Sequence, residues 1–108
     1  MIKAVMYWER FRLEVTGHAG YEQAGKDIVC AAASMLDNAL AGALDEMEQR
    51  GRCEMKAVVN EMKGSFMVWA NPTMGAVSEC KAYFRMAVKG FRMLQQAYPG
   101  LVSIREVQ

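Results

Sequence analysis

The only histidine of the chain, His18, and its first cysteine, Cys30, are the residues best suited to nucleophilic chemistry. A cysteine attacks a carbonyl carbon as its thiolate, and an ordinary thiol with a pKa of about 8.5 is ionised to a few per cent at pH 7. A neighbouring imidazolium favours the thiolate and then acts as general acid or base. The pair fits a cysteine hydrolase, although a surface histidine and a buried cysteine would show the same spacing.

The start of a predicted helix supports the same chemistry. Asp27 is expected to be the N-cap, because its carboxylate can accept hydrogen bonds from free amides, which places Cys30 in the first turn. A helix N-terminus favours an anion by about 0.3–1 kcal/mol, so we expect the thiolate to need His18 as well. The same amides are the donors that an oxyanion needs in acyl transfer. Ser34 follows one turn later on the same face, where it either fixes Cys30 or simply occupies the helix interior.

The segment between the two residues is rich in glycine. Gly17, Gly20 and Gly25 indicate a backbone that turns sharply or approaches another group closely. Residues 20–27 also read G-x-x-x-x-G-K-D, which is close to a phosphate-binding loop. Asp27, however, stands where such a loop needs a Ser or Thr hydroxyl for magnesium, and its charge would oppose a phosphate. Nucleotide binding is therefore not expected.

The elements that must position these residues follow from hydrophobic periodicity. Apolar steps of three and four residues predict a helix of about 24 residues ending at Gly51, with close backbone packing at Gly42. A second helix runs from Gly75 or Ala76 to Pro99–Gly100. Alternation predicts strands that form two hairpins and a final strand, with a break at residues 71–73; the strands cover residues 2–8, 11–16, 53–62, 65–70 and 101–107. The expected fold class is α+β: a two-layer sandwich in ββαββαβ order, with a mostly antiparallel sheet and two long helices on one face.

The second helix has one apolar and one basic face. Its apolar residues form a heptad stripe, which we expect to cover the sheet, although it also suits self-association; the stripe consists of Val77, Cys80, Phe84, Ala87, Phe91, Leu94 and Tyr98. Its other face carries a basic row, which is typical of a solvated surface and also suits RNA or an acidic partner; the row consists of Lys81, Arg85, Lys89 and Arg92.

Composition narrows the function classes further. A chain of 108 residues with a formal charge of +1 predicts one domain over residues 1–108 and no generic affinity for nucleic acid. One His and three Cys exclude a two-His metal site or a four-Cys zinc site within one subunit. The start does not read as a signal peptide, and the longest uncharged run has 15 residues, so no membrane span is expected. The odd number of cysteines favours a reducing cytoplasm, with Cys53 and Cys80 as inert thiols.

Residues 17–34 carry a recognisable motif. Gly17-His18-Ala19-Gly20, then Tyr21, then the run from Gly25 to Ser34 (GKDIVCAAAS) resembles the signature of the ribosomal-processing cysteine protease family, Prp. The family pattern is G-H-A, a short glycine-containing loop, and G-x-D-I-V-C-A-x-x-S. Beyond residue 50 the resemblance is one of organisation and not of motif.

The resemblance implies a cytoplasmic homodimeric endopeptidase that removes a short N-terminal extension from large-subunit ribosomal protein twenty-seven. It implies Cys30 as nucleophile and His18 as base, with Asp27 and Ser34 as supporting residues. Gly17, Gly20 and Gly25 match the glycines of a flexible active-site loop. No metal or organic cofactor is implied, and neither a membrane nor direct nucleic-acid binding is expected. The alternatives are a non-catalytic ribosome-assembly or RNA-binding factor that uses the basic row, and a thiol redox sensor at Cys30.

Overall fold

The computed structural model describes residues 1–17, 26–60 and 62–108, with only the backbone of Lys26 and Asp27. The elements follow the predicted ββαββαβ order, with one short 3-10 helix added before the second long helix. Their bounds are β1 Ile2–Tyr7, β2 Arg12–Thr16, α1 Lys26–Gln49, β3 Cys53–Asn60, β4 Ser65–Pro72, η1 Met74–Ala76, α2 Val77–Ala97 and β5 Val102–Val107.

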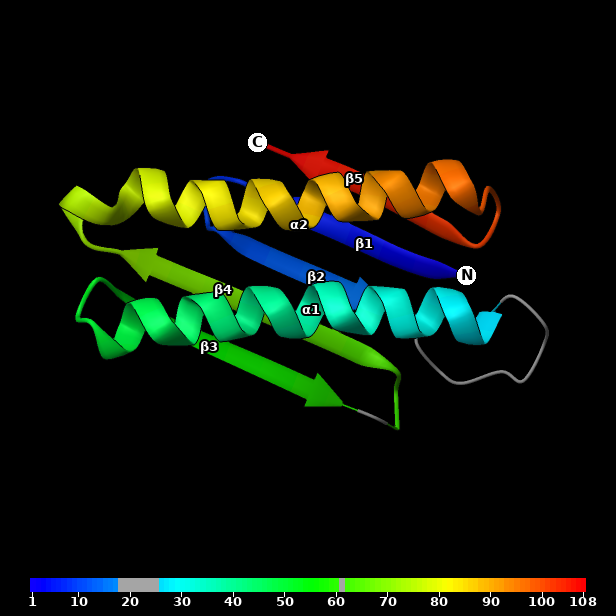
Figure 1. Ribbon diagram of the computed structural model, residues 1–108, viewed down its shortest axis with the longest axis horizontal. Coiled ribbons are helices and arrows are strands. Elements are labelled where there is room, and N and C mark those ends of the chain that lie inside the picture. Colours follow the sequence, from blue (N-terminus) through cyan, green and yellow to red (C-terminus); the bar gives the residue numbers. More distant parts are fainter. Residues whose placement is uncertain (18–25, 61) are drawn as a thin grey trace.

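The five strands form one sheet in the order β3-β4-β2-β1-β5. The pairs β1–β2, β2–β4 and β3–β4 are antiparallel, and β1–β5 is parallel. Helices α1 and α2 lie side by side across one face of this sheet (Figure 1). The predicted α+β class and the mostly antiparallel sheet are therefore confirmed.

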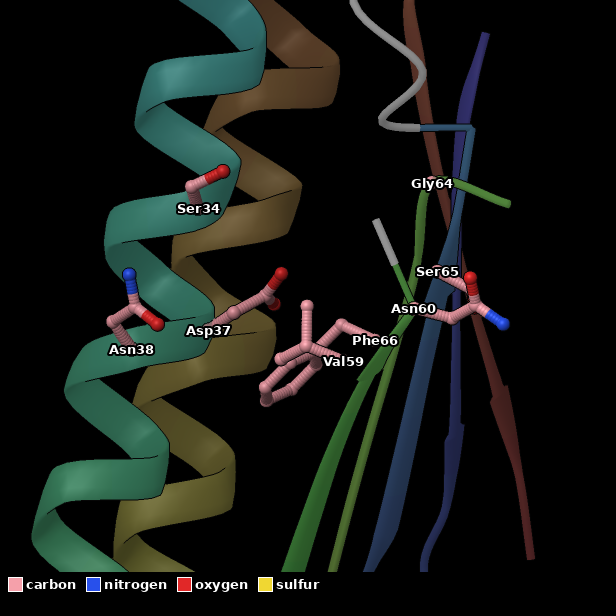
Figure 2. A pocket seen from close by; sticks show the side chains of 8 residues that line it. All are labelled: Ser34, Asp37, Asn38, Val59, Asn60, Gly64, Ser65 and Phe66. Atoms are coloured by element: carbon pink, nitrogen blue, oxygen red, sulfur yellow. The ribbon is translucent and has the colours of Figure 1, made fainter. Parts of the chain in front are cut away.

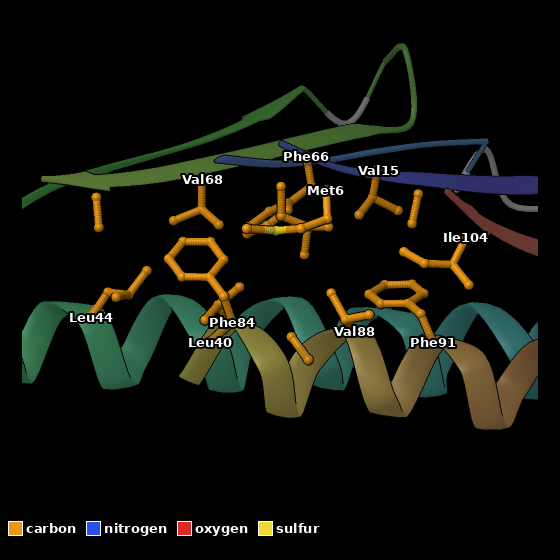
Figure 3. Packing of buried hydrophobic residues seen from close by; sticks show 14 of the residues in the cluster. Met6, Val15, Leu40, Leu44, Phe66, Val68, Phe84, Val88, Phe91 and Ile104 are labelled. Carbon is orange, nitrogen blue, oxygen red and sulfur yellow. The ribbon is translucent and has the colours of Figure 1, made fainter. Parts of the chain in front are cut away.

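The core lies between the helices and the sheet, where alternate strand residues meet the inner faces of the helices (Figure 3). From the sheet, Met6, Leu13 and Val68 are fully buried, and from α2 Phe84 and Phe91 are fully buried. The heptad stripe thus covers the sheet, as favoured, and only its first residue, Val77, is largely exposed at 42%. A self-association seam along this stripe is ruled out by its burial.

Three local expectations are wrong. The helix α1 begins at Lys26, so Asp27 lies within its first turn instead of forming its N-cap. The strand β4 continues through Asn71 to Pro72 instead of breaking there. Proline is tolerated at this end because β2 pairs with β4 only as far as Trp69, so the missing N–H of Pro72 interrupts no hydrogen bond to β2. A Cβ at Gly42 would meet nothing within 4 Å, whereas one at Gly90 would meet the Leu36 side chain. The close helix contact is thus made by Gly90.

Candidate active site

Cys30 lies near the start of α1, on the border between the buried and exposed faces of the helix. The preceding residue, Val29, is 1% exposed and packs in the core, whereas Ile28, one residue earlier, is 62% exposed. Cys30 itself is half-buried and packs against the edge of the core. The thiol is free, so it combines a fixed helical backbone with a partly open side chain.

The other two cysteines lie in environments that suppress reactivity. Both Cys53 and Cys80 are buried free thiols. Burial is the main cause that raises the pKa of Cys53, whose Sγ donates to the carbonyl oxygen of Leu44 at 3.5 Å. Burial also raises the pKa of Cys80 to about 12. Because the thiolate is the nucleophile, these two positions agree with inert structural thiols and leave Cys30 as the accessible one.

A cleft of about 460 Å³ opens beside Cys30's helix, between α1 and the β3–β4 hairpin (Figure 2). Ser34, one turn after Cys30, is exposed and lines this cleft. The wall combines neutral polar groups, two apolar side chains and one carboxylate; its residues are Ser34, Asp37, Asn38, Val59, Asn60, Gly64, Ser65 and Phe66. The cleft lies at the β3 edge of the sheet.

Asp37 is the cleft residue that the sequence reasoning missed. It is 3% exposed and is the only buried charged residue in the described ranges. The signal was present, because Ala33, Leu40 and Leu44 flank it at helical steps of four, three and seven residues and are all buried. A carboxylate at a core-facing position departs from the apolar pattern of the helix, and no motif of reactive residues draws attention to it.

Several predicted site residues lie outside the part of the chain that the structure describes. His18, Gly20 and Gly25 lie outside the described residues, as does the side chain of Asp27. Gly17 is described, with φ of +92°, and a Cβ there would lie 2.1 Å from the carbonyl oxygen of Met1. Only glycine fits both conditions, so the chain leaves β2 in a direction fixed by the N-terminal residue.

The basic row lines a second groove, of about 580 Å³, toward the opposite edge of the sheet, where α2 faces the ends of β1 and β5. Its positive charge is partly balanced there. Arg92 forms an ion pair with Glu106, which also accepts a hydrogen bond from the Trp8 indole at 2.8 Å. The Arg92 hydrogen bond is the main cause that lowers the pKa of Glu106. Among the described residues, this groove shares no lining residue with the cleft that contains Ser34.

Within the described ranges, no group of three or more His, Cys, Asp or Glu residues is placed to hold a metal ion. Among the same residues, one helical stretch, Ile28–Gln49, has the length and hydropathy of a membrane-crossing helix. Core helices of folded domains meet the same criteria, and Leu40, Leu44 and Met47 of this stretch are buried beneath the sheet.

Comparison with known proteins identifies relatives over nearly the whole chain. A family model described as cysteine protease Prp matches residues 1–103. The crystal structure of SMU.848 from Streptococcus mutans is 26% identical, with a TM-score of 0.76 over 98% of this chain and 91% of that one. The structure of an essential ribosomal processing protease Prp from S. aureus, in complex with a substrate peptide, is 17% identical, with a TM-score of 0.75 over 98% and 99%. The latter likeness concerns the fold alone, and no curated protein matches.

Proposed function

The chain belongs to the Prp family of cysteine proteases, and from that premise we propose that it removes the N-terminal extension of large-subunit ribosomal protein twenty-seven, with Cys30 as nucleophile. The observation that carries the assignment of Cys30 is the contrast among three thiols. Cys30 is half-buried at a helix start, whereas burial raises the pKa of both Cys53 and Cys80. The motif resemblance over residues 17–34 and the ribosomal processing named for the S. aureus neighbour support the substrate.

The proposed reaction proceeds through an acyl-enzyme. His18 takes the proton from the Cys30 thiol as the sulfur attacks the scissile carbonyl carbon, forming a C–S bond and an oxyanion. Backbone N–H groups at the start of α1 stabilise that oxyanion. The intermediate collapses, the C–N bond breaks, and His18 gives its proton to the leaving amine. Water then hydrolyses the thioester with His18 as base, which restores the Cys30 thiol.

The supporting residues have less direct roles in the proposal. Asp27, in the first turn of α1, adds negative charge where the amides are free, and a third catalytic residue is not required by the scheme. Ser34 lines the cleft one turn after Cys30 and can contact the bound chain. By the family resemblance, we propose that Gly17, Gly20 and Gly25 belong to the active-site loop.

The substrate is proposed to bind as an extended tail, through apolar contacts and strand-like pairing. Strand β3 is an edge of the sheet, because only β4 pairs with it. Its residues Val58 and Val59 are 43% and 61% exposed. An exposed apolar edge strand is a common acceptor for an extended peptide, since main-chain bonds supply affinity and side-chain contacts supply selectivity.

The direct test uses the extended ribosomal protein encoded in the same genome. We expect the purified chain to convert it to one shorter product whose new N-terminus, read by mass spectrometry, lies at the end of the extension. The Cys30→Ala and His18→Ala variants are expected to leave the protein intact. Cleavage at the parent rate by either variant would refute the mechanism, and an intact substrate with the parent enzyme would refute the substrate.

We further propose that the enzyme is a cytoplasmic homodimer that does not bind nucleic acid directly. The dimer is implied by the family resemblance, and it does not use the buried heptad stripe. Light scattering is expected to give twice the chain mass of 12.1 kDa. The groove of the basic row also contains Glu9 and Glu106, so we expect no salt-sensitive RNA binding in a filter assay. Binding that is lost on charge reversal of Lys81, Arg85 and Lys89 would favour the assembly-factor alternative.

A further inference from the structure

The basic groove along the flank of α2, of about 580 Å³, takes no part in the proposed cleavage reaction. Its α2 wall carries three exposed cations that form no ion pair with any described residue: Lys81, Arg85 and Lys89. The fourth member of the basic row, Arg92, is paired with Glu106. Helix α2 lies toward the β5 side of the sheet, whereas α1 and its cleft lie toward the β3 side (Figure 1). The groove is therefore a second surface, separate from the candidate active site.

The sheet side of the groove presents two half-buried aromatic rings, Trp8 and Phe11, from the connection between β1 and β2. Phe11 has a φ of +45°, in the left-handed region that a bulky residue seldom adopts. Its ring stacks on Phe84 at a centroid distance of 5.7 Å, and its carbonyl oxygen accepts a hydrogen bond from the Ala70 N–H at 3.0 Å. The Trp8 indole donates a hydrogen bond to Glu106 at 2.8 Å. Both rings are thus held in place by contacts within the fold.

The spacing of the three cations matches that of an extended polypeptide. Lys81, Arg85 and Lys89 follow one another at steps of four residues, so a rise of about 1.5 Å per residue places them about 6 Å apart along the helix axis. In an extended chain, alternate side chains point to the same side and repeat about every 6.6 Å. Three acidic side chains at alternate positions can therefore reach all three cations, while the side chains between them face Trp8 and Phe11.

We propose that this groove binds an extended acidic segment of a partner protein, in which acidic residues alternate with apolar ones. Charge complementarity with Lys81, Arg85 and Lys89 selects the segment. Contact of its apolar side chains with Trp8 and Phe11 adds affinity, because apolar area is removed from water. The groove is an interaction surface in addition to the cleavage site, and the proposal holds for any substrate that Cys30 cleaves.

The same groove is less suited to a nucleic-acid strand. Glu9 and Glu106 also line it, and their carboxylates repel the phosphates of a continuous polyanion. The formal charge of the chain is only +1, so the protein as a whole offers little long-range attraction to such a strand. An alternating peptide avoids the repulsion, because its carboxylates all point toward α2.

The test measures the binding of fluorescein-labelled peptides of nine residues by fluorescence anisotropy, at an ionic strength of about 0.1 M. The first peptide has glutamate at positions 3, 5 and 7, leucine at positions 4 and 6, and serine elsewhere. The second has glutamine in place of each glutamate, and the third has the composition of the first with its three glutamates consecutive. We expect the alternating acidic peptide to bind at least about 10-fold more tightly than the glutamine peptide, because it forms charge-assisted hydrogen bonds. It is also expected to bind more tightly than the consecutive peptide, which cannot direct all three carboxylates to one side.

Charge reversals locate the binding site. Arg85→Glu reverses the central cation of the row and is expected to weaken binding of the alternating peptide by at least about 10-fold; Lys89→Glu is a second, independent reversal. Lys3→Glu is the matched control, because it makes the same change in net charge at an exposed position outside the groove. Lys3 lies about 16 Å along β1 from Trp8, beyond the Debye length of about 10 Å, so the control is expected to keep the parent affinity. All three positions are exposed, and circular dichroism checks that the variants fold.

Three results would overturn the proposal. The first is equal binding of the alternating and glutamine peptides, or of the alternating and consecutive peptides. The second is binding of the alternating peptide that survives in folded Arg85→Glu and Lys89→Glu. The third is tighter binding of a nine-nucleotide oligouridylate than of the alternating peptide, lost in the same two variants, which would favour RNA as the occupant. None of these measurements depends on cleavage, so the role of Cys30 stands or falls separately.

Discussion

A Cβ atom at Gly90 would lie 2.4 Å from Cδ2 of Leu36, so α1 and α2 reach their observed spacing because residue 90 has no side chain. Leu36 lies on α1 between Ser34 and Asp37, and the contact therefore fixes the part of the helix that lines the cleft. The position of the candidate site thus depends on packing with α2, on the side of α1 away from the hairpin.

Gly90→Ala is expected to destabilise the protein by about 1–3 kcal/mol, because the added methyl forces Leu36 or the helix to move. The matched control is Gly42→Ala, where a Cβ meets nothing within 4 Å. That variant gains helix propensity and is expected to be more stable by up to about 1 kcal/mol. Urea unfolding of both variants measures the difference; a Gly90→Ala protein as stable as Gly42→Ala would show that the helices are not in close contact.

The three thiols are expected to differ sharply in alkylation. Iodoacetamide at pH 8 should label Cys30 in the native protein, because it is half-buried and free. Cys53 and Cys80 should stay unlabelled, since both are buried and the pKa of Cys80 is raised to about 12. Peptide mapping by mass spectrometry identifies the labelled residue, and unfolding in guanidinium before labelling should expose all three. Native labelling of Cys80 ahead of Cys30 would contradict the structural contrast.

The fold was predictable because its determinants are periodic. Both helices and all five strands follow from apolar spacing, and the stripe containing Phe84 and Phe91 indicates the face that covers the sheet. The parallel pairing of β5 with β1 joins segments that are distant in sequence, so no local sequence pattern predicts it. Gly90 was not singled out for a similar reason, since the side chain that would clash with its Cβ belongs to another helix.

The candidate site was predictable only in part. The motif around Cys30 predicts the reactive residues through its resemblance to the family signature, because the spacing of His18 and Cys30 alone also fits a surface histidine and a buried cysteine. Asp37 was overlooked because its place in the cleft depends on the hairpin that contains Val59 and Phe66 and forms the far wall. Such a wall is assembled by tertiary structure, and residue types along one helix do not show it.

Glu79 is expected to make the stability of the fold depend on pH. It joins α2 to the connection between α1 and β3, accepting hydrogen bonds from Arg52 at 2.7 Å and Arg50 at 2.8 Å. The Arg52 hydrogen bond is the main cause that lowers its pKa below the ordinary 4.5. A lowered pKa stabilises the fold above the ordinary value, and that stabilisation is lost as pH falls through the lowered pKa of the folded state.

Glu79→Gln is therefore expected to lower the Tm at pH 7, by an amount that shrinks as the pH is reduced below 4.5. Thermal unfolding of both proteins from pH 7 to pH 3 checks this. Glu54→Gln, on the exposed part of β3, serves as the control and should change the Tm little at any pH. A Glu79→Gln deficit that is constant across the range would show that the ion pairs are not its source.

The decisive experiment measures the rate at which the extended ribosomal protein is cleaved by three variants, each with one cysteine replaced by alanine. We predict that Cys30→Ala loses cleavage by at least about 10³-fold, because in the proposed mechanism no other group supplies the nucleophile. Cys53→Ala and Cys80→Ala are predicted to retain the parent kcat at a temperature where circular dichroism shows them folded. Retained cleavage in Cys30→Ala, or its loss in folded Cys53→Ala or Cys80→Ala alone, would contradict the assignment of Cys30.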